Sequence, residues 1–281
     1  MCKLIIHGGF FSEHETDLNT KISKQDSLKE IILLGYDYLK NHSSLQTVSY
    51  VVSLLEDSHW FNAGTGSQIQ SDGEIRMSAS IMDGVTKKFA GVVNIQNIKN
   101  PILVAEKLLD YDDKVIGGEG ANLFASKIGF SYYNPITDQR KDEYNLRKAG
   151  NGSGTVGCVA LDDNSNLAVA TSTGGKGFEM LGRISDSATT SGNFANQNCA
   201  VSCTGIGEDI VRVALASSIV IRVTDGLTIE DSFKKTFAEL NEFDGFAGAI
   251  GIDKYGNFYH KESIPSIVYA QYDGENLRIF D

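Results

Sequence analysis

The chain has 281 residues, of which 41% are hydrophobic and 22% are charged, a composition typical of a folded globular protein. Its formal net charge of −11 argues against nucleic acid or an anionic membrane as the main partner, because both are negatively charged and would repel it. The four cysteines are too scattered for a disulfide framework. No signal-peptide core or membrane-length apolar run is evident, and we therefore expect a cytoplasmic protein.

The first half of the chain carries apolar residues at the spacing of helices, then of an antiparallel sheet, then of helices again. A short buried strand is expected to end at Gly8-Gly9 and to be followed by a polar loop to about residue 20. The Asp-Gly pairs at 72–73 and 83–84 suit hairpin turns. The predicted strands are 4–7, 75–82 and 89–95, and the predicted helices are 27–40, 43–56, 101–109 and 120–127.

The second half begins after a polar, glycine-ended stretch, residues 134–154, which predicts a long exposed connector. Beyond it we expect strands at 155–161, 167–173 and 199–203, helices at 208–223 and 229–240, and strands to the end. Helices and hairpin-paired strands without strict βαβ alternation predict a layered α+β fold.

Thr155 stands where the connector meets a strand, between Gly154 and Val156-Gly157. Taken alone, a Thr in this place is most often an ordinary strand residue. If the bond between Gly154 and Thr155 were cut, however, Thr155 would own a hydroxyl and a free α-amino group, whose pKa of about 7.7–8.0 suits a general base. Nucleophile and base would then be one residue, and no histidine would be required.

Two further clusters carry groups that suit an amino-acid substrate. Arg183 offers a planar fork to an α-carboxylate and Asp186 offers an acceptor to an α-ammonium, although spacing alone favours an Arg–Asp ion pair that holds a surface loop. Thr204 and Gly205 lie where a strand turns through glycines toward a helix near Glu208. The backbone N–H groups of such a turn and the Thr204 hydroxyl could donate hydrogen bonds to the negative charge that develops on a tetrahedral intermediate. A tight turn alone would explain the same glycines.

These clusters occur together, and in this order, in one known family. The chain resembles the plant-type asparaginases and isoaspartyl aminopeptidases, which are N-terminal nucleophile hydrolases, over nearly its whole length. The stretches that carry the resemblance are HGG (7–9), FNAGTGS (61–67), SASIMDG (78–84), NPI (100–102), GTVGCVALD (154–162), LAVATSTGG (167–175), GRISDS (182–187) and SCTGIGE (202–208).

The resemblance implies a four-layer αββα sandwich, with residues 1–281 made as one single-domain precursor that cuts itself between Gly154 and Thr155. The products would be an α subunit, 1–154, ending in the exposed linker 134–154, and a β subunit, 155–281. The family's usual assembly is a homodimer of such αβ units. Its substrates are asparagine and β-aspartyl (isoaspartyl) dipeptides, from which an acyl-enzyme releases aspartate.

The resemblance also assigns roles to matching positions. Thr155 would be nucleophile and base, supported by Thr173, and Asn62 would orient it. Thr204 and Gly205 would supply the oxyanion donors, while Arg183, Asp186 and Gly207 would bind the substrate. No catalytic cofactor is implied, but a structural sodium or potassium ion is, held largely by main-chain oxygens of Leu55, Glu56, Ser58, Phe61, Ala63 and Thr65.

Some positions depart from the family pattern. Phe10-Phe11 replaces small residues after HGG (7–9). Lys176–Met180 replaces a more typical Thr-Asn-Lys segment after TSTGG (171–175). These departures lie where substrate entry is shaped, so they leave the substrate specificity open. Two alternatives also stand beside the main hypothesis: a glycosylasparaginase-like hydrolase, and a precursor that never cleaves and acts as an amino-acid-binding or scaffold protein.

Overall fold

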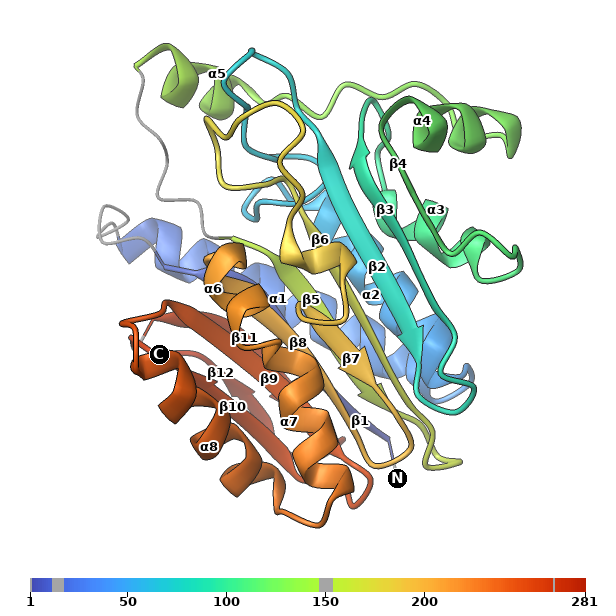
Figure 1. Cartoon of the computed structure of the whole chain (residues 1–281), viewed down its shortest axis with the longest axis vertical. Helices are drawn as coiled ribbons and strands as arrows, with labels where there is room; N and C mark the ends of the chain where they lie inside the picture. The colour runs from blue at the N-terminus through green and yellow to red at the C-terminus, as the bar shows by residue number, and fades with distance from the viewer. Residues whose placement is uncertain (1, 12–17, 147–153, 265) are drawn as a thin grey trace.

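Two β-sheets and the helices that pack on them make up the computed structural model, which describes residues 2–11, 18–146, 154–264 and 266–281 (Figure 1). An eight-stranded sheet has the order β12-β11-β1-β5-β6-β2-β3-β4, and a four-stranded sheet has the order β10-β9-β8-β7. The strands are β1 (Lys3–Phe10), β2 (Met77–Asp83), β3 (Phe89–Ile95), β4 (Val115–Gly117), β5 (Val156–Leu161), β6 (Leu167–Thr173), β7 (Asn193–Ala195), β8 (Cys199–Gly205), β9 (Ala247–Asp253), β10 (Phe258–Glu262), β11 (Ile267–Tyr272) and β12 (Leu277–Ile279).

The helices divide between the two sheets. Helices α1, α2 and α3 pack against strands of the large sheet, whereas α7 contacts β8 and α8 contacts β10 of the small sheet. The large sheet is antiparallel except for the parallel pair β3 and β4. The helices are α1 (Leu18–Leu39), α2 (Ser44–Asp57), α3 (Pro101–Leu108), α4 (Gly118–Lys127), α5 (Asp138–Asn145), the 3-10 turn η1 (Asp186–Ala188), α6 (Gly207–Arg212), α7 (Leu215–Thr224) and α8 (Ile229–Asn241).

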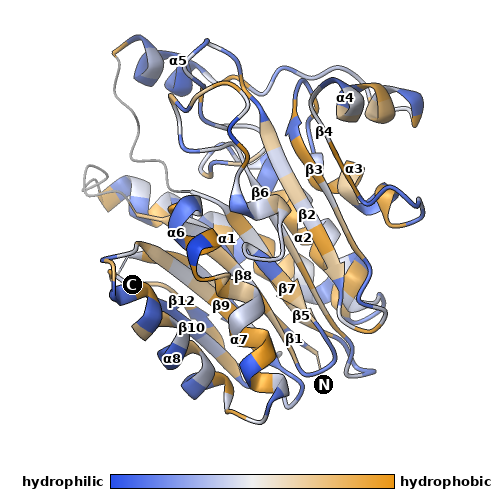
Figure 2. Ribbon diagram, viewed as in Figure 1, coloured by the Kyte–Doolittle hydropathy of each residue, from blue (hydrophilic) through white to orange (hydrophobic). Residues whose placement is uncertain are grey.

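Three apolar cores hold these elements together, and apolar residues concentrate in the central strands (Figure 2). The first lies between the large sheet and helices α1, α2 and α3, and the second lies between the small sheet and α7 and α8. The third joins the facing sides of the two sheets and includes Ile5, Val159, Val169 and Ala200. Burial of such side chains is the main favourable contribution to folding.

The facing sides of the sheets change from apolar to polar along the strands. Because side chains alternate across a strand, residues two apart share a face. From the apolar core, the facing residues of β5 run from Val159 through Gly157 to Thr155, which lies just before the strand. In β6 they run from Val169 through Thr171 to Thr173, and in β8 from Ala200 through Ser202 to Thr204. All three series end in buried hydroxyls.

Several expected elements differ in their bounds. The first strand runs through both glycines to Phe10, because Gly8 packs against Phe61 instead of forming a turn. Helix α1 begins at Leu18, nine residues before its predicted start, and part of the expected preceding loop lies outside the described residues. The single helix expected at 208–223 is two helices, because Ala214 adopts a left-handed conformation with φ of 48°.

The connector expected at 134–154 contains a helix, α5, which is capped by Thr137 and has no fully buried residue. The part of the connector from 147 to 153 lies outside the described residues. No helix in the described ranges is long and apolar enough to cross a membrane.

Candidate active site

Three threonine hydroxyls from three strands meet at the polar end of the space between the sheets. Thr155 immediately precedes β5, Thr173 ends β6, and Thr204 is the penultimate residue of β8. The Thr155 hydroxyl donates to Thr173 Oγ1 at 3.3 Å, and the Thr155 N–H, an amide in the uncut chain, donates to Thr204 Oγ1 at 3.4 Å. All three residues are buried. The fold thus brings together three predicted residues that lie up to 49 positions apart in sequence.

Asn62 joins the residue before Thr155 to the turn that follows Thr173. Its Nδ2 donates to the Gly175 carbonyl at 2.5 Å, and its Oδ1 accepts from the Gln68 N–H at 2.9 Å. A Cβ added to Gly154 would lie 3.0 Å from the Asn62 Cβ, so the chain passes close to Asn62 just before Thr155. Asn62 is therefore placed to fix the two segments that flank the hydroxyl pair.

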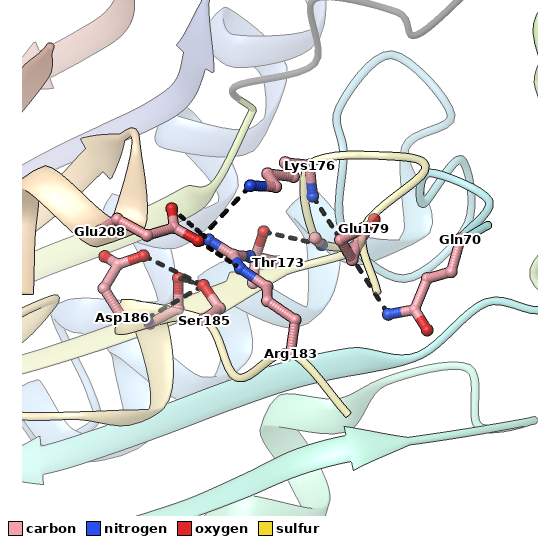
Figure 3. A network of polar contacts seen from close by, with 10 residues as sticks. Gln70, Thr173, Lys176, Glu179, Arg183, Ser185, Asp186 and Glu208 are labelled. Carbon is pink, nitrogen blue, oxygen red and sulfur yellow. Dashed lines mark hydrogen bonds and ion pairs between the residues drawn. The ribbon is translucent and has the colours of Figure 1, made fainter. Parts of the chain in front are cut away.

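Arg183 is held by a carboxylate on the facing helix. Its Nε and Nη2 donate to the two carboxylate oxygens of Glu208 in α6, each at 3.1 Å, and Lys176 Nζ lies 3.5 Å from the same carboxylate (Figure 3). Burial raises the pKa of Glu208, but the hydrogen bonds from Arg183 and from the backbone, together with the charges of Arg183 and Lys176, outweigh burial and lower that pKa to about 2. The expected alternative, an ion pair between Arg183 and Asp186, is wrong.

Asp186 is buried with one carboxylate oxygen free. Its Oδ1 accepts from the Ser185 hydroxyl at 3.0 Å, whereas no hydrogen bond reaches Oδ2 from any described residue. Burial raises the pKa of Asp186 to about 6, opposed by the Ser185 hydrogen bond and the charge of Arg183. Since an unpaired buried oxygen is costly, this one suits a ligand that brings its own donor.

Gly207 lies between these two charged groups. A Cβ at Gly207 would lie 2.6 Å from Asp186 Oδ1 and 2.8 Å from Arg183 Nη2, so both groups border the same small space. The preceding turn needs Gly205, whose φ is 134° and whose added Cβ would meet the Phe246 carbonyl oxygen at 2.6 Å. Both glycines are thus required by close approach, and the predicted substrate-binding residues converge.

The loop expected to hold a cation closes α2. Its turns depend on Gly64 and Gly66, with φ of 53° and 91°. The Glu56 carbonyl accepts from the Thr65 N–H at 2.7 Å, but among the described residues no backbone hydrogen bond reaches the carbonyl oxygens of Phe61, Ala63 or Thr65. The Leu55 and Ser58 carbonyls accept only long hydrogen bonds, of 3.3 and 3.4 Å. Oxygen donors of this kind fit a hard cation such as sodium or potassium.

Glu56 itself is buried beside this loop. Its Oε1 accepts from the Ser172 hydroxyl at 2.6 Å and from the Ile102 N–H at 3.0 Å. Burial raises the pKa of Glu56 to about 8, although both hydrogen bonds oppose the shift. The Glu56 side chain therefore ties α2 to β6 and α3, while only its main chain belongs to the loop.

Several residues near the site were given no role by the sequence, although they lie within the stretches quoted from it. His7, Ser202 and Thr171 form a buried polar row next to the three threonines, with His7 Nε2 2.8 Å from Ser202 Oγ. Alternation within the predicted strands was the available signal for Thr171 and Ser202, since they lie two positions from Thr173 and Thr204, respectively. Phe178 stacks on Tyr144 of α5 with ring centroids 5.2 Å apart, a contact that no sequence pattern indicated.

Comparison with known proteins agrees with this geometry. A protein-family model described as asparaginase matches residues 1–279. An isoaspartyl peptidase/L-asparaginase of Nostoc is 42% identical over 98% of this chain and 93% of its own length. One of the same name from Synechocystis is 39% identical over 97% of this chain and 88% of its own length. A plant-type L-asparaginase of Pyrococcus horikoshii is 32% identical over 96% of each chain. The chain belongs to the asparaginase family whose members include these isoaspartyl peptidases and plant-type asparaginases.

Proposed function

We propose that this protein is a self-processing amidohydrolase that releases L-aspartate from L-asparagine and from β-aspartyl peptides. The single observation that carries the proposal is the meeting of the Thr155, Thr173 and Thr204 hydroxyls directly after Gly154, at the junction of the connector and β5. The names of the related proteins describe the same pair of activities.

Self-cleavage creates the base that the uncut chain lacks. While Thr155 N is an amide it cannot accept a proton, but the free amine released by hydrolysis of the Gly154–Thr155 bond can. That amine takes the proton of the Thr155 hydroxyl, and Oγ1 attacks the side-chain carbonyl carbon of the substrate. Thr173, 3.3 Å away, keeps the hydroxyl aligned.

The remaining site residues stabilise the tetrahedral intermediate and bind the substrate. The Thr204 hydroxyl and the Gly205 N–H donate to the negative oxygen that forms on the attacked carbonyl. The proton held by the Thr155 amine passes to the leaving nitrogen, which departs as ammonia or a peptide amine. Water then attacks the ester on Thr155 and releases aspartate. Asp186 and Arg183 bind the α-ammonium and the α-carboxylate beside Gly207.

Three wider features complete the proposal. The layers stack as helix, sheet, sheet and helix in a four-layer αββα sandwich of the N-terminal nucleophile type, which the cores on both faces of the two sheets support. The α subunit, 1–154, and the β subunit, 155–281, stay together as one unit because β5 and β6 pair within the sheet that also contains β1 and β2. Two such units form a homodimer, and the loop after α2 holds a structural sodium or potassium ion.

The test is intact-mass measurement of the purified protein during incubation at neutral pH, with N-terminal sequencing of the products. We expect two fragments, the smaller beginning at Thr155, and release of aspartate from asparagine and from β-aspartyl dipeptides. Thr155→Ala should abolish cleavage and hydrolysis, whereas Asp186→Ala should cleave but not hydrolyse. Persistent full-length protein that releases no aspartate would refute the proposal, and so would ready turnover by Thr155→Ala.

A further inference from the structure

A row of buried polar groups lies one step deeper in the molecule than the three threonines. His7 of β1 is fully buried, and its Nε2 lies 2.8 Å from Ser202 Oγ of β8. Ser202 Oγ lies in turn 2.8 Å from Thr171 Oγ1 of β6. The row therefore links the two sheets through side-chain hydrogen bonds, and Ser80 and Asn193, opposite Thr171 and Ser202 in the register, link them again at the same level.

The register of the strands sets this row directly beside the nucleophile. His7 is opposite Gly157 in the β1–β5 pair, and Gly157 is opposite Thr171 in the β5–β6 pair. Thr155 lies two residues before Gly157 on the same face. A Cβ at Gly157 would lie 2.3 Å from His7 Nε2 and 2.0 Å from Ser202 Oγ. The imidazole thus occupies the space that a side chain between Thr155 and the apolar core would otherwise fill.

The imidazole is held neutral. Burial lowers the pKa of His7 to about 3, and the Thr155 backbone is close enough to oppose this shift. A neutral imidazole has one donor and one acceptor nitrogen. When the Ser202 hydroxyl donates to Nε2, the remaining hydrogen lies on Nδ1, which has no hydrogen bond of ordinary geometry with any described residue. The Thr155 main chain also adjoins the ring.

The other strand residues on this face near His7 show that a polar ring is unnecessary for packing. Ile5, two residues before His7, is fully buried on the same face, and Val159 is opposite it in β5. An apolar side chain at position 7 would continue this core, but it would leave the buried Ser202 hydroxyl with Thr171 as its remaining partner among the described residues. The imidazole is therefore explained by the polar groups that it adjoins, Ser202 and the Thr155 backbone.

We infer that His7 is a positioning residue, which with Ser202 fixes the main chain of Thr155 for self-cleavage and for hydrolysis. The inference rests on the proposed function, since it concerns the same nucleophile. His7 does not touch the substrate or exchange protons with it. Its effect is on the direction of the Thr155 hydroxyl and amine, for which small displacements are costly in rate.

Two isosteric variants separate the two sides of the ring. His7→Asn keeps a polar atom near the position of Nδ1 and loses the bond to Ser202, whereas His7→Gln keeps a polar atom near the position of Nε2 and with it the bond to Ser202. The measurements are the rate of Gly154–Thr155 cleavage by intact mass, kcat and KM of the cleaved enzyme for asparagine, and the melting temperature. His260→Gln is the control, because His260 of β10 in the small sheet is a partly buried histidine that packs on Tyr269 of β11 and makes no hydrogen bond to Ser202 in the described part of the chain.

We expect His7→Asn, which loses the bond to Ser202, to slow cleavage and lower kcat by about ten- to a hundredfold with KM changed less than about threefold, and His7→Gln, which keeps that bond, to retain most of both rates. Wild-type rates in His7→Asn, or losses that follow the melting temperature equally in both variants, would overturn the inference. If His7→Asn does not fold, Ser202→Ala takes its place: a lower kcat at an unchanged melting temperature supports the inference, and an unchanged kcat overturns it. A wild-type protein that neither cleaves nor hydrolyses would instead refute the proposed function.

Discussion

The Thr155 hydroxyl lies 3.3 Å from the Thr173 hydroxyl, and both side chains are buried on the same face of adjacent antiparallel strands. Thr173 also accepts the Gly175 N–H at 3.2 Å, which fixes its own orientation. Thr173 is thus placed to hold the nucleophile without taking part in the bond changes.

We therefore expect Thr173→Val, which keeps the shape and removes the hydroxyl, to lower kcat by about a hundredfold or more with little change in KM. Thr173→Ser should recover most of the loss, because it restores the oxygen. Steady-state kinetics on the cleaved enzyme check both variants. Equal kcat values in Thr173→Val and the wild type would show that the Thr173 hydroxyl does not hold the nucleophile.

The bidentate pair between Arg183 and Glu208 predicts an effect on substrate binding. Glu208→Gln removes the charge that holds the guanidinium, and the partly exposed pair is worth only a small free energy. We expect KM for asparagine to rise about two- to fivefold while kcat stays nearly constant. Lys176→Met is the matched control, because Lys176 reaches the same carboxylate from an exposed position and should change KM less. A large fall in kcat in Glu208→Gln would contradict this role.

Asp186 predicts a dependence of activity on pH. Only the ionised carboxylate attracts an α-ammonium, and its pKa is raised to about 6. We expect kcat/KM to fall as pH decreases through about 6, and Asp186→Asn to lower kcat/KM strongly at pH 8. The profile is measured on the cleaved enzyme with asparagine. A kcat/KM that stays constant between pH 5 and 8 would show that Asp186 does not bind the ammonium as its carboxylate.

The same residue predicts an opposite effect on stability. The carboxyl pKa of Asp186 is higher in the folded chain, about 6, than its ordinary value of 3.8, so the free energy of unfolding falls as pH rises through this window. Asp186→Asn should therefore be more stable than the wild type above pH 6, by about 1–3 kcal/mol, and the difference should vanish below pH 4. Denaturant titrations of the cleaved form at pH 4 and 8 check this. A difference that persists at pH 4 would point to another cause.

Features of the fold that depend on neighbouring residues could be predicted from the sequence, whereas contacts between residues far apart in the chain could not. Alternating strands such as Leu167–Thr173 had the expected bounds, since their pattern is local. Breaks that depend on single backbone angles could not be predicted, because Ala214 gives no glycine or proline signal before α7. The Glu208 partner of Arg183 also escaped prediction, because 25 residues separate them and no local spacing links them.

The sequence could predict which face of each strand carries the site residues, but it could not predict which residues of different strands lie side by side. Alternation placed Thr171 and Thr173 on one face, but only the pairing of β1 with β5 brings His7 to the level of Gly157. Likewise the long connector was expected as a loop. Its helix α5 is stabilised by contacts with distant segments, such as the Arg140 Nε hydrogen bond of 2.7 Å to the Gly66 carbonyl.

Ala214 gives a stability prediction that is independent of the site. A left-handed conformation costs an L-residue with a Cβ roughly 1–2 kcal/mol, and glycine avoids this cost. We expect Ala214→Gly to raise the free energy of unfolding by about 0.5–1 kcal/mol. Ala216→Gly, two residues further on inside α7, is the matched control and should lower it by about 1 kcal/mol. Destabilisation by both would mean that the φ of residue 214 is not left-handed in solution.

The contact between Phe178 and Tyr144 connects the helix before the cleavage site with the loop that carries Arg183. The rings are stacked at an angle of 8°, and Phe178 adopts a left-handed φ of 55°, which is unfavourable for an aromatic residue. The stack therefore helps to hold the loop in a conformation that it would not adopt alone. Tyr144→Ala should loosen the loop from the α5 side without touching any residue that contacts the substrate.

We expect Tyr144→Ala to raise KM for asparagine about two- to tenfold with kcat little changed, because Arg183 and its neighbours must then be ordered on binding. Limited proteolysis should also cut the loop between Lys176 and Arg183 faster than in the wild type. Tyr132→Ala, at a position that is 77% exposed, is the matched control for loss of an aromatic ring and should leave both measurements unchanged. An unchanged KM and cleavage rate in Tyr144→Ala would mean that α5 is only a passive part of the connector, whereas the expected result would make the segment before Thr155 a contributor to substrate binding after the chain is cut.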